Sequence, residues 1–335
     1  MDKRRLMPTD LYEFTPVGEP QISPNGSLVA FVRQFTDFPG NIIRTEIWMV
    51  SAAGGTPRPL TSGGKTDAMP RWSPDGARLC FVSDRCGRNQ LYLMDPAGGE
   101  ARVIATEEEP KSPPEWSPDG KSIAFVAGVK MQPEAPFYPG APEDTAVPSP
   151  KEREEQNRPK VIKTIRHKQE GVGFFGDSFT HVFVVSAEPT MAGERKPVRQ
   201  VTAGRYNHAA PAWSPDGRYL AFVACREEPD ADLNWLRHLW IRDLGTGDLR
   251  RVLADDYTVH SPVFSPDGAS VAFLSTGCAM DWGATPSSLY TIEFRPERFP
   301  LSFSDATNLT AAIDREIGSS AGSEVRYGGS ARSIC

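Results

Sequence analysis

One pentapeptide of the sequence has the form of a serine nucleophile motif. Gly318, Ser320 and Gly322 fit the pattern G-x-S-x-G, in which the serine sits on a sharp turn between a strand and a helix. The chemistry also needs an acid and then a histidine later in the chain. Only 15 residues follow Ser320, and none of them is histidine. We therefore predict that Ser320 is no nucleophile, and we assign no catalytic residue in this chain.

Other motifs that could hold a cofactor or a metal fail on their context. Residues 171–176 fit the dinucleotide pattern G-x-G-x-x-G, but a strand pattern follows, so no helix N-terminus is available for a pyrophosphate. Asp230, Asp232 and Asn234 begin like a calcium loop, yet Trp235 stands where the turn needs glycine. The five histidines are scattered singly, at positions 167, 181, 208, 238 and 260. The sequence therefore predicts neither a metal nor a cofactor.

A tetrapeptide that occurs five times organises the chain. Its copies are Ser23–Gly26, Ser73–Gly76, Ser117–Gly120, Ser214–Gly217 and Ser265–Gly268. Proline presets φ at the second turn position, Asp or Asn suits the third, and glycine supplies the positive φ that follows. Each copy therefore predicts a hairpin turn. The spacings are 50, 44, 97 and 51 residues, so either one unit before Ser214 has lost its tetrapeptide or one unit carries a long insertion.

The same strand patterns flank each tetrapeptide. A strand with a small residue followed by Phe comes after every copy, as in Ala30-Phe31 and Ala124-Phe125. These strands are apolar on both faces, as in a sheet packed between two other sheets. A third apolar strand and a short fourth strand follow in most units. Four strands per unit of this length predict a propeller blade, which explains the repeated Phe better than a sandwich of unrelated hairpins does.

Composition excludes several classes of protein. Hydrophobic residues make up 39% of the chain and charged residues 24%, which is enough apolar material for a sizeable core. A net charge of −6 is a poor match for nucleic acid, and no apolar stretch has the length of a membrane span or an export signal. The five cysteines are odd in number and lack a CxxC pair, which indicates reduced thiols. We expect a cytoplasmic protein that binds neither nucleic acid nor membranes.

The domain organisation follows from the repeat. We expect an all-β chain with a propeller over residues 11–327, an N-terminal tail at 1–10 and a C-terminal tail at 328–335. Residues 131–160 hold seven prolines and the charge run 151–155, so they should form an exposed insertion loop. With this loop set aside, the chain supplies five to six blades of about 48 residues each.

The repeated turn with its aromatic neighbour, the segment Ile165–Phe174 and the run His181–Val185 resemble the N-terminal propeller of the prolyl oligopeptidase family of serine peptidases. The likeness is greatest to the acylaminoacyl-peptidase and dipeptidyl-peptidase branch, and the blade also resembles that of the translocation protein TolB. In the peptidase family a seven-bladed propeller sits over an α/β-hydrolase domain, which carries the Ser, Asp and His triad, and limits which peptides reach it. The resemblance therefore implies an incomplete ring here, with five to six blades of seven.

The resemblance also implies a partner and a substrate class. The stretch after Gly268 is far shorter than the ~200 residues of an α/β domain, so we expect the catalytic domain to be absent from this chain and the chain to be inactive alone. In the dipeptidyl-peptidase branch two propeller glutamates hold the free amino terminus of the substrate. Glu227 and Glu228 are the candidates for this role here, with an ordinary solvated loop as the alternative. A standalone TolB-like scaffold for protein interaction is the alternative function.

Overall fold

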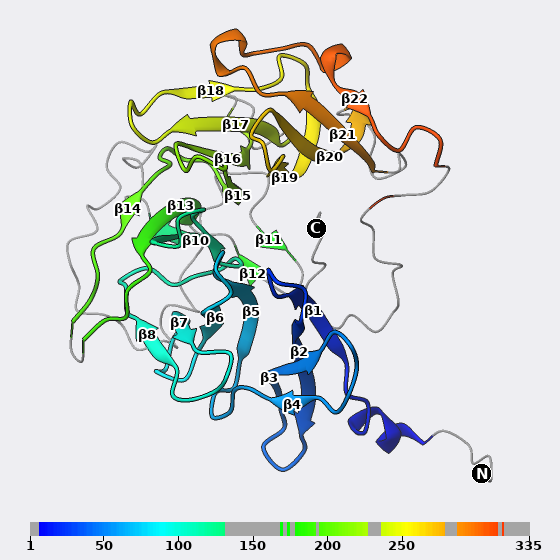
Figure 1. Cartoon of the computed structure of the whole chain (residues 1–335), viewed down its shortest axis with the longest axis vertical. Coiled ribbons are helices and arrows are strands. Elements are labelled where there is room, and N and C mark those ends of the chain that lie inside the picture. Colours follow the sequence, from blue (N-terminus) through cyan, green and yellow to red (C-terminus); the bar gives the residue numbers. More distant parts are fainter. Residues whose placement is uncertain are drawn as a thin grey trace, which may run out of the picture.

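The computed structural model describes residues 7–130, 168–169, 173–174, 178–191, 194–226, 236–278, 287–313 and residue 317. Within these residues, five four-stranded antiparallel sheets follow one another along the chain. Figure 1 shows them side by side along an arc in chain order, with the first and the last sheet at its two ends. The predicted all-β propeller of four-stranded blades is therefore confirmed.

Each sheet is built from strands in the order of the sequence, apart from one insertion. The first sheet contains β1 (Val17–Ile22), β2 (Leu28–Asp37), β3 (Ile42–Ser51) and β4 (Arg58–Pro59), and the second contains β5 (Asp67–Trp72), β6 (Leu79–Ser83), β7 (Gln90–Met94) and β8 (Arg102–Ile104). The third contains β9 (Glu115–Trp116), β10 (Ser122–Lys130), β13 (Ser178–Ser186) and β14 (Arg199–Gln200). The fourth contains β15 (His208–Trp213), β16 (Tyr219–Ala224), β17 (His238–Asp243) and β18 (Leu249–Arg251). The fifth contains β19 (Tyr257–Phe264), β20 (Ser270–Cys278), β21 (Ser288–Glu293) and β22 (Thr307–Asn308).

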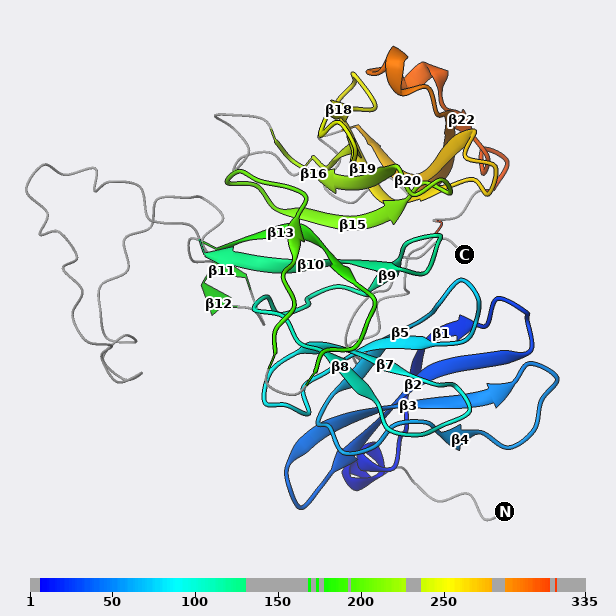
Figure 2. The same cartoon turned by 60° about the vertical axis from the view of Figure 1, so that its left-hand side comes forward.

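The third sheet explains the long spacing between two of the tetrapeptides. β10 pairs with β13 from Ser122 opposite Ser186 to Lys130 opposite Ser178, so one unit carries a long insertion between its second and third strands. Part of the insertion is a ribbon of β11 (Lys168–Gln169) and β12 (Gly173–Phe174), which Figure 2 shows beside β10. The predicted loop at 131–160, the tail at 328–335 and most of the pattern at 171–176 lie outside the described residues.

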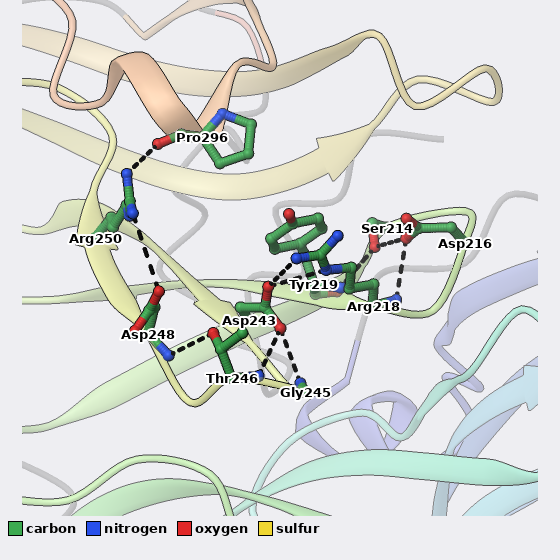
Figure 3. Close-up of polar contacts among 10 residues, drawn as sticks. All are labelled: Ser214, Asp216, Arg218, Tyr219, Asp243, Gly245, Thr246, Asp248, Arg250 and Pro296. Carbon is green, nitrogen blue, oxygen red and sulfur yellow. Dashed lines mark hydrogen bonds and ion pairs between the residues drawn. The ribbon is translucent and has the colours of Figure 1, made fainter.

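Every repeated tetrapeptide joins the first two strands of its sheet, as predicted. In the fourth sheet Ser214 Oγ donates to Asp216 Oδ1, as Figure 3 shows. The backbone N–H of Arg218 donates to Asp216 Oδ1 at 3.0 Å, and that of Tyr219 donates to Ser214 Oγ at 2.8 Å. Gly217 has a φ of 69°, in the left-handed region that favours glycine. The Ser-to-Asp or Ser-to-Asn bond occurs in the other four turns as well.

Successive turns also touch one another. A Cβ atom on Gly217 would lie 3.9 Å from Pro118 Cδ, and one on Gly268 would lie 3.6 Å from Pro215 Cδ. Gly76 and Gly120 meet Pro24 and Pro74 in the same way. The proline of each turn therefore lies beside the glycine of the next turn, and the turns form a row from sheet to sheet.

Buried apolar layers hold the sheets together. The Phe of the second strand is fully buried in four sheets, at positions 81, 125, 222 and 273. Phe81 packs in a cluster with Ala30 and Ile47 of the first sheet, whereas the adjacent Cys80 packs in a cluster with side chains of the third sheet. The prediction that these strands are covered on both faces is therefore confirmed. Phe31, at the same position in the first sheet, is only half-buried, because no described sheet precedes it.

Tryptophans before the turns join the innermost strands. The indole N–H groups of Trp72, Trp116 and Trp213 donate to the carbonyl oxygens of Gln21, Arg71 and Glu115, at 3.0, 3.1 and 3.0 Å. Each acceptor stands two residues before the turn serine of the preceding sheet. Phe264 takes the place of Trp in the fifth sheet, where it packs edge-to-face with Phe294 at 5.0 Å between ring centroids.

Arginines make a third set of contacts between sheets, at the outermost strands. Arg58 of β4, Arg199 of β14 and Arg250 of β18 donate to carbonyl oxygens of Pro96, Leu244 and Pro296 in the following sheet, at 2.7, 2.7 and 2.9 Å. Figure 3 shows the last of these bonds. Inner strands, turns and outer strands are thus each tied to the next sheet by a repeated contact.

The innermost strands share a bulge that the sequence analysis did not anticipate. A proline stands three residues before each turn serine, at positions 20, 70, 114, 211 and 262. In four of the sheets the preceding residue has a positive φ of 47° to 59°, and the pairing register shifts there: Glu19, Met69, Ala210 and Ser261. Proline has no N–H group for the ladder, so a bulge accommodates it.

Helical structure in the described residues is limited to short 3-10 turns. They are η1 (Pro8–Tyr12), η3 (Pro296–Arg298) and η4 (Phe303–Asp305). η1 extends across residue 10, where the sequence predicts the end of the N-terminal tail. No helix in this part of the chain has the length and apolar character needed to cross a membrane.

The tryptophan bonds lead to a stability prediction. Trp213→Phe removes the indole N–H and leaves the Glu115 carbonyl without its donor from the fourth sheet, so we expect a loss of about 1 kcal/mol in the free energy of unfolding. Trp48→Phe is the matched control, because Trp48 donates to the Glu46 side chain within its own sheet. Urea unfolding measures both variants. A loss for Trp213→Phe no larger than that for Trp48→Phe would show that the bond between sheets contributes no stability.

Candidate functional site

The two ends of each sheet differ in what they carry. The tetrapeptide turns occupy one end, and the connections between second and third strands and between consecutive sheets occupy the opposite end, which we call the loop face. Glu227 and Glu228 fall between β16 and β17 in the sequence. They lie outside the described residues, so the site is built from the side chains that flank this connection.

In the second sheet an arginine at the loop face has a carboxylate built in beside it. Asp67 begins β5, and Arg85 stands two residues after the end of β6. Arg85 Nη2 lies 2.9 Å from both carboxylate oxygens of Asp67, whose side chain is fully buried. The guanidinium also lies over the rings of Phe81 and Tyr92, 5.4 and 4.9 Å from their centroids. The buried negative charge is therefore paired within the sheet.

The fourth sheet has the same arrangement with a histidine in place of the aspartate. His208 begins β15 and is fully buried, and Arg226 stands two residues after the end of β16. Arg226 Nη1 lies 2.8 Å from His208 Nε2 and 3.0 Å from the carbonyl oxygen of Ala203. The guanidinium lies over the rings of Tyr206 and Trp240, 5.0 and 5.5 Å from their centroids. Arg226 therefore faces an imidazole where Arg85 faces a carboxylate.

The partners of His208 determine its protonation state. Nδ1 lies 3.1 Å from the carbonyl oxygen of Thr180, which can only accept, so Nδ1 carries the proton. Nε2 then accepts the hydrogen bond from Arg226. Burial, with added repulsion from His181 and Arg226, lowers the pKa of His208 to about 3. His208 is therefore neutral at physiological pH.

His181 joins this group from the third sheet. It lies on β13 and is fully buried, and its ring centroid is 5.0 Å from that of His208. Nδ1 lies 3.3 Å from Thr202 Oγ1, whereas Nε2 has no hydrogen-bond partner among the described residues. Burial and then the charge of Arg226 lower the pKa of His181. We call His181, His208 and Arg226 the His–Arg cluster.

A second titratable pair lies on the innermost strands. Glu115 Oε1 of β9 is 3.7 Å from Arg71 Nε of β5. Desolvation raises the pKa of Glu115 to about 7, and the nearby Arg71 opposes this effect. Because the backbone carbonyl of Glu115 also accepts the indole N–H of Trp213, this residue ties together the inner strands of three sheets.

At the end of the sheets that carries the turns, a hollow lies between the turns of the third and fourth sheets. Its lining consists of Ser117, Pro118, Asp119, Ser122, Trp213, Pro215, Asp216 and Gly217. Both of its carboxylates already accept hydrogen bonds from the serines of their own turns. The hollow is therefore a product of the repeated turn.

The His–Arg cluster was not predicted from the sequence, in which His181 and His208 stand among singly scattered histidines. A signal was nevertheless present in the repeat. Asp67 and His208 both stand six residues before a turn serine, and Arg85 and Arg226 both stand twelve residues after it. Aligning the units on the turn would have shown that an aspartate and a histidine occupy equivalent positions.

The other candidates named from the sequence are not placed by the structure. Ser320 lies outside the described residues, as do Glu227 and Glu228 and the calcium-like stretch 230–235. Within the described part of the chain, no group of three or more His, Cys, Asp or Glu side chains is arranged to hold a metal ion.

Comparison with known proteins identifies the type of propeller. Residues 14–135 match the family described as the TolB beta propeller domain. The uncharacterized peptidase YuxL of Bacillus subtilis is 32% identical over 230 residues, which cover 68% of this chain and 32% of that protein. Dipeptidyl-peptidase 5 of Porphyromonas gingivalis is 27% identical over 286 residues, which cover 81% of this chain and 39% of that protein. The chain therefore spans about a third of the length of the curated relatives it matches.

Solved structures agree with this comparison at the level of the fold. Acylaminoacyl peptidase of Pyrococcus horikoshii has a TM-score of 0.62 at 14% identity, covering 92% of this chain and 41% of that chain. TolB from Agrobacterium tumefaciens has a TM-score of 0.51 at 19% identity, covering 84% of this chain and 78% of that chain. The resemblance to the propellers of TolB and of these peptidases is therefore confirmed.

The buried His208 leads to a pH prediction. Its pKa of about 3 in the folded protein lies below the ~6.5 of an unfolded histidine, so the unfolded chain binds the proton more readily. The stability that comes from keeping His208 neutral is fully present above pH ~6.5 and is lost as the pH falls toward 3. Between pH 6.5 and 5 we expect a loss of about 2 kcal/mol from this group, measured by urea unfolding.

The matched control is His208→Gln, which keeps a polar side chain but cannot titrate. Its free energy of unfolding should fall less than that of the parent protein over the same pH interval, even if the variant is less stable at pH 7. The same pH dependence in both proteins would show that His208 is not the group responsible.

Proposed function

We propose that this chain is the propeller part of a serine peptidase of the prolyl oligopeptidase family, and that it docks peptide substrates and limits their access to a hydrolase domain. The observation that supports it is the match to two peptidases over most of this chain but only about a third of their length. In the full-length enzyme the hydrolysis would be of the acylaminoacyl or dipeptidyl type.

On this proposal the loop face is where peptides dock. Glu227 and Glu228 follow Arg226 directly in the sequence, and their carboxylates would hold the free amino terminus of a peptide by charge-assisted hydrogen bonds. Arg226 itself is held by His208 and by two aromatic rings. A docking group next to a fixed side chain loses less conformational entropy when a ligand binds.

The chemical step belongs to the hydrolase domain. A serine there attacks the scissile carbonyl, a histidine takes the serine proton and passes it to the leaving amine, and an aspartate orients the histidine. The present sequence has no histidine after Ser320, so it offers no triad in the order of that fold. The contribution of this chain is selection by docking and by size.

We also place the protein in the cytoplasm, with peptides as its ligands and without nucleic acid or membrane partners. Within the described part of the chain, Cys80 and Cys86 are free thiols, which suits a reducing compartment. The net charge of −6 suits neither a nucleic-acid backbone nor an anionic lipid surface.

The first test of this proposal is activity. The purified 335-residue chain should hydrolyse neither acetyl-aminoacyl nor dipeptidyl chromogenic substrates, because it lacks the ordered triad. Turnover that a serine-directed fluorophosphonate blocks would overturn the assignment of a non-catalytic role. Sequencing the transcript past the codon for Cys335 is the companion experiment. A reading frame that continues into a Ser, Asp and His hydrolase domain is expected, and a stop codon there would favour a TolB-like scaffold.

The second test concerns Glu227 and Glu228. In the double variant Glu227→Gln/Glu228→Gln we expect about tenfold weaker binding of a fluorescent tripeptide with a free amino terminus, which corresponds to about 1.4 kcal/mol. Binding of the N-acetylated tripeptide should not change. The control variant is Glu108→Gln/Glu109→Gln, a pair of adjacent glutamates on the connection between the second and third sheets. Equal effects of the two double variants would refute the assignment of Glu227 and Glu228.

A further inference from the structure

We propose that Arg226 binds a carboxylate supplied by a ligand, and that this carboxylate is the C-terminus or an acidic side chain of a peptide. That Arg226 binds a carboxylate is inferred from a comparison of the second and fourth sheets. That this carboxylate belongs to a peptide rests on the proposed function. This site would bind a negatively charged group of the ligand, whereas Glu227 and Glu228 would bind its positively charged amino terminus.

The second and fourth sheets hold an arginine in equivalent places. Arg85 and Arg226 both stand two residues after the second strand, and each lies over an aromatic ring of the third strand, Tyr92 or Trp240. These two rings are equivalent, because Tyr92 and Trp240 each lie opposite the repeated Phe of the second strand of their own sheet. The main difference is the group that the guanidinium meets at the start of the first strand.

In the second sheet that group is the buried carboxylate of Asp67, with both oxygens 2.9 Å from Arg85 Nη2. In the fourth sheet it is neutral His208, which accepts one hydrogen bond from Arg226. Among the described residues no carboxylate lies within ion-pair distance of Arg226. The same structural position therefore has its counter-charge built into one sheet and lacks it in the other.

The donors of Arg226 are arranged for a planar anion. Both of its hydrogen bonds, to His208 Nε2 and to the Ala203 carbonyl, use Nη1. Nε and Nη2 have no acceptor among the described residues, and their N–H groups lie side by side in the guanidinium plane, with the spacing that fits the two oxygens of one carboxylate. Burial lowers the pKa of Arg226, which reflects the cost of an uncompensated charge there.

His181 is an independent sign of a polar ligand at this place. It is fully buried, and its Nε2 has no partner among the described residues, whereas buried polar atoms are paired in the great majority of cases. Thr202 Oγ1 already accepts from the N–H of Val182, so its own proton can go to His181 Nδ1 at 3.3 Å. Nε2 then carries a hydrogen that has no acceptor among the described residues.

The test uses the full 335-residue chain and isothermal titration calorimetry with three probes. These are the tripeptide Ala-Ala-Phe with a free C-terminus, its C-terminal amide, and acetyl-Ala-Glu-Ala-amide. We expect one of the two carboxylate probes to bind more tightly than Ala-Ala-Phe-amide, and the better probe identifies whether the carboxylate is C-terminal or on a side chain. Arg226→Gln should weaken that probe at least tenfold without changing the binding of Ala-Ala-Phe-amide.

His208→Asp keeps the proposal testable if Arg226→Gln does not fold. It reproduces the arrangement of Asp67 and Arg85, so its internal carboxylate should occupy Arg226 and weaken the carboxylate probe by a similar factor. Arg85→Gln is the matched control, because it removes the equivalent arginine of the second sheet and should leave the affinity for the probe unchanged.

Three results would overturn the inference. The first is equal binding of all three probes, and the second is an affinity for the carboxylate probe that does not change in His208→Asp. The third is tighter binding of that probe by Glu227→Gln/Glu228→Gln, because it would show that the chain supplies its own counter-charge. Failure of the proposed function is a different result. In that case the free amino terminus has no effect on binding, while the dependence on the carboxylate and on Arg226 persists.

Discussion

The central sheets of this protein depend on having both faces covered by neighbouring sheets. Successive residues of a strand point to opposite faces, so one second strand contributes to two apolar layers. Phe81 packs toward the first sheet, while Cys80 packs toward the third. The stability of any sheet is therefore tied to the sheets beside it, as in other repeat architectures. Phe31 holds the same position in the first sheet, which has no described sheet before it, and it is only half-buried.

The two ends of the sheets differ in how strongly the contacts between sheets constrain their residues. At one end the turns use their Ser and their Asp or Asn for internal hydrogen bonds, and the glycine of each of the last four turns lies beside the proline of the preceding turn. These positions tolerate little change, because each has a defined partner. At the loop face no such repeated turn constrains the described residues.

The loop face also shows how a repeated position can acquire a different chemistry. The Asp67 carboxylate neutralises Arg85 inside the second sheet. In the fourth sheet the arginine meets the neutral acceptor His208 instead, and no carboxylate of the described residues is paired with it. Structural stability alone would favour an internal ion partner, since a buried charge is costly without one. The replacement thus fits a surface that receives ligands, as the proposed docking of peptides requires.

The sequence by itself determined the repeated hairpin turn, the strands around it and the Phe that packs between sheets, because these depend on local φ preferences and on an apolar pattern within one unit. It left open whether the long unit had an insertion, since the pairing of Ser122 with Ser186 joins strands across that insertion. The His–Arg cluster was decided only by the tertiary structure. His181 comes from one sheet and His208 and Arg226 from the next, and such contacts are set by register and by packing between sheets, which no local pattern encodes.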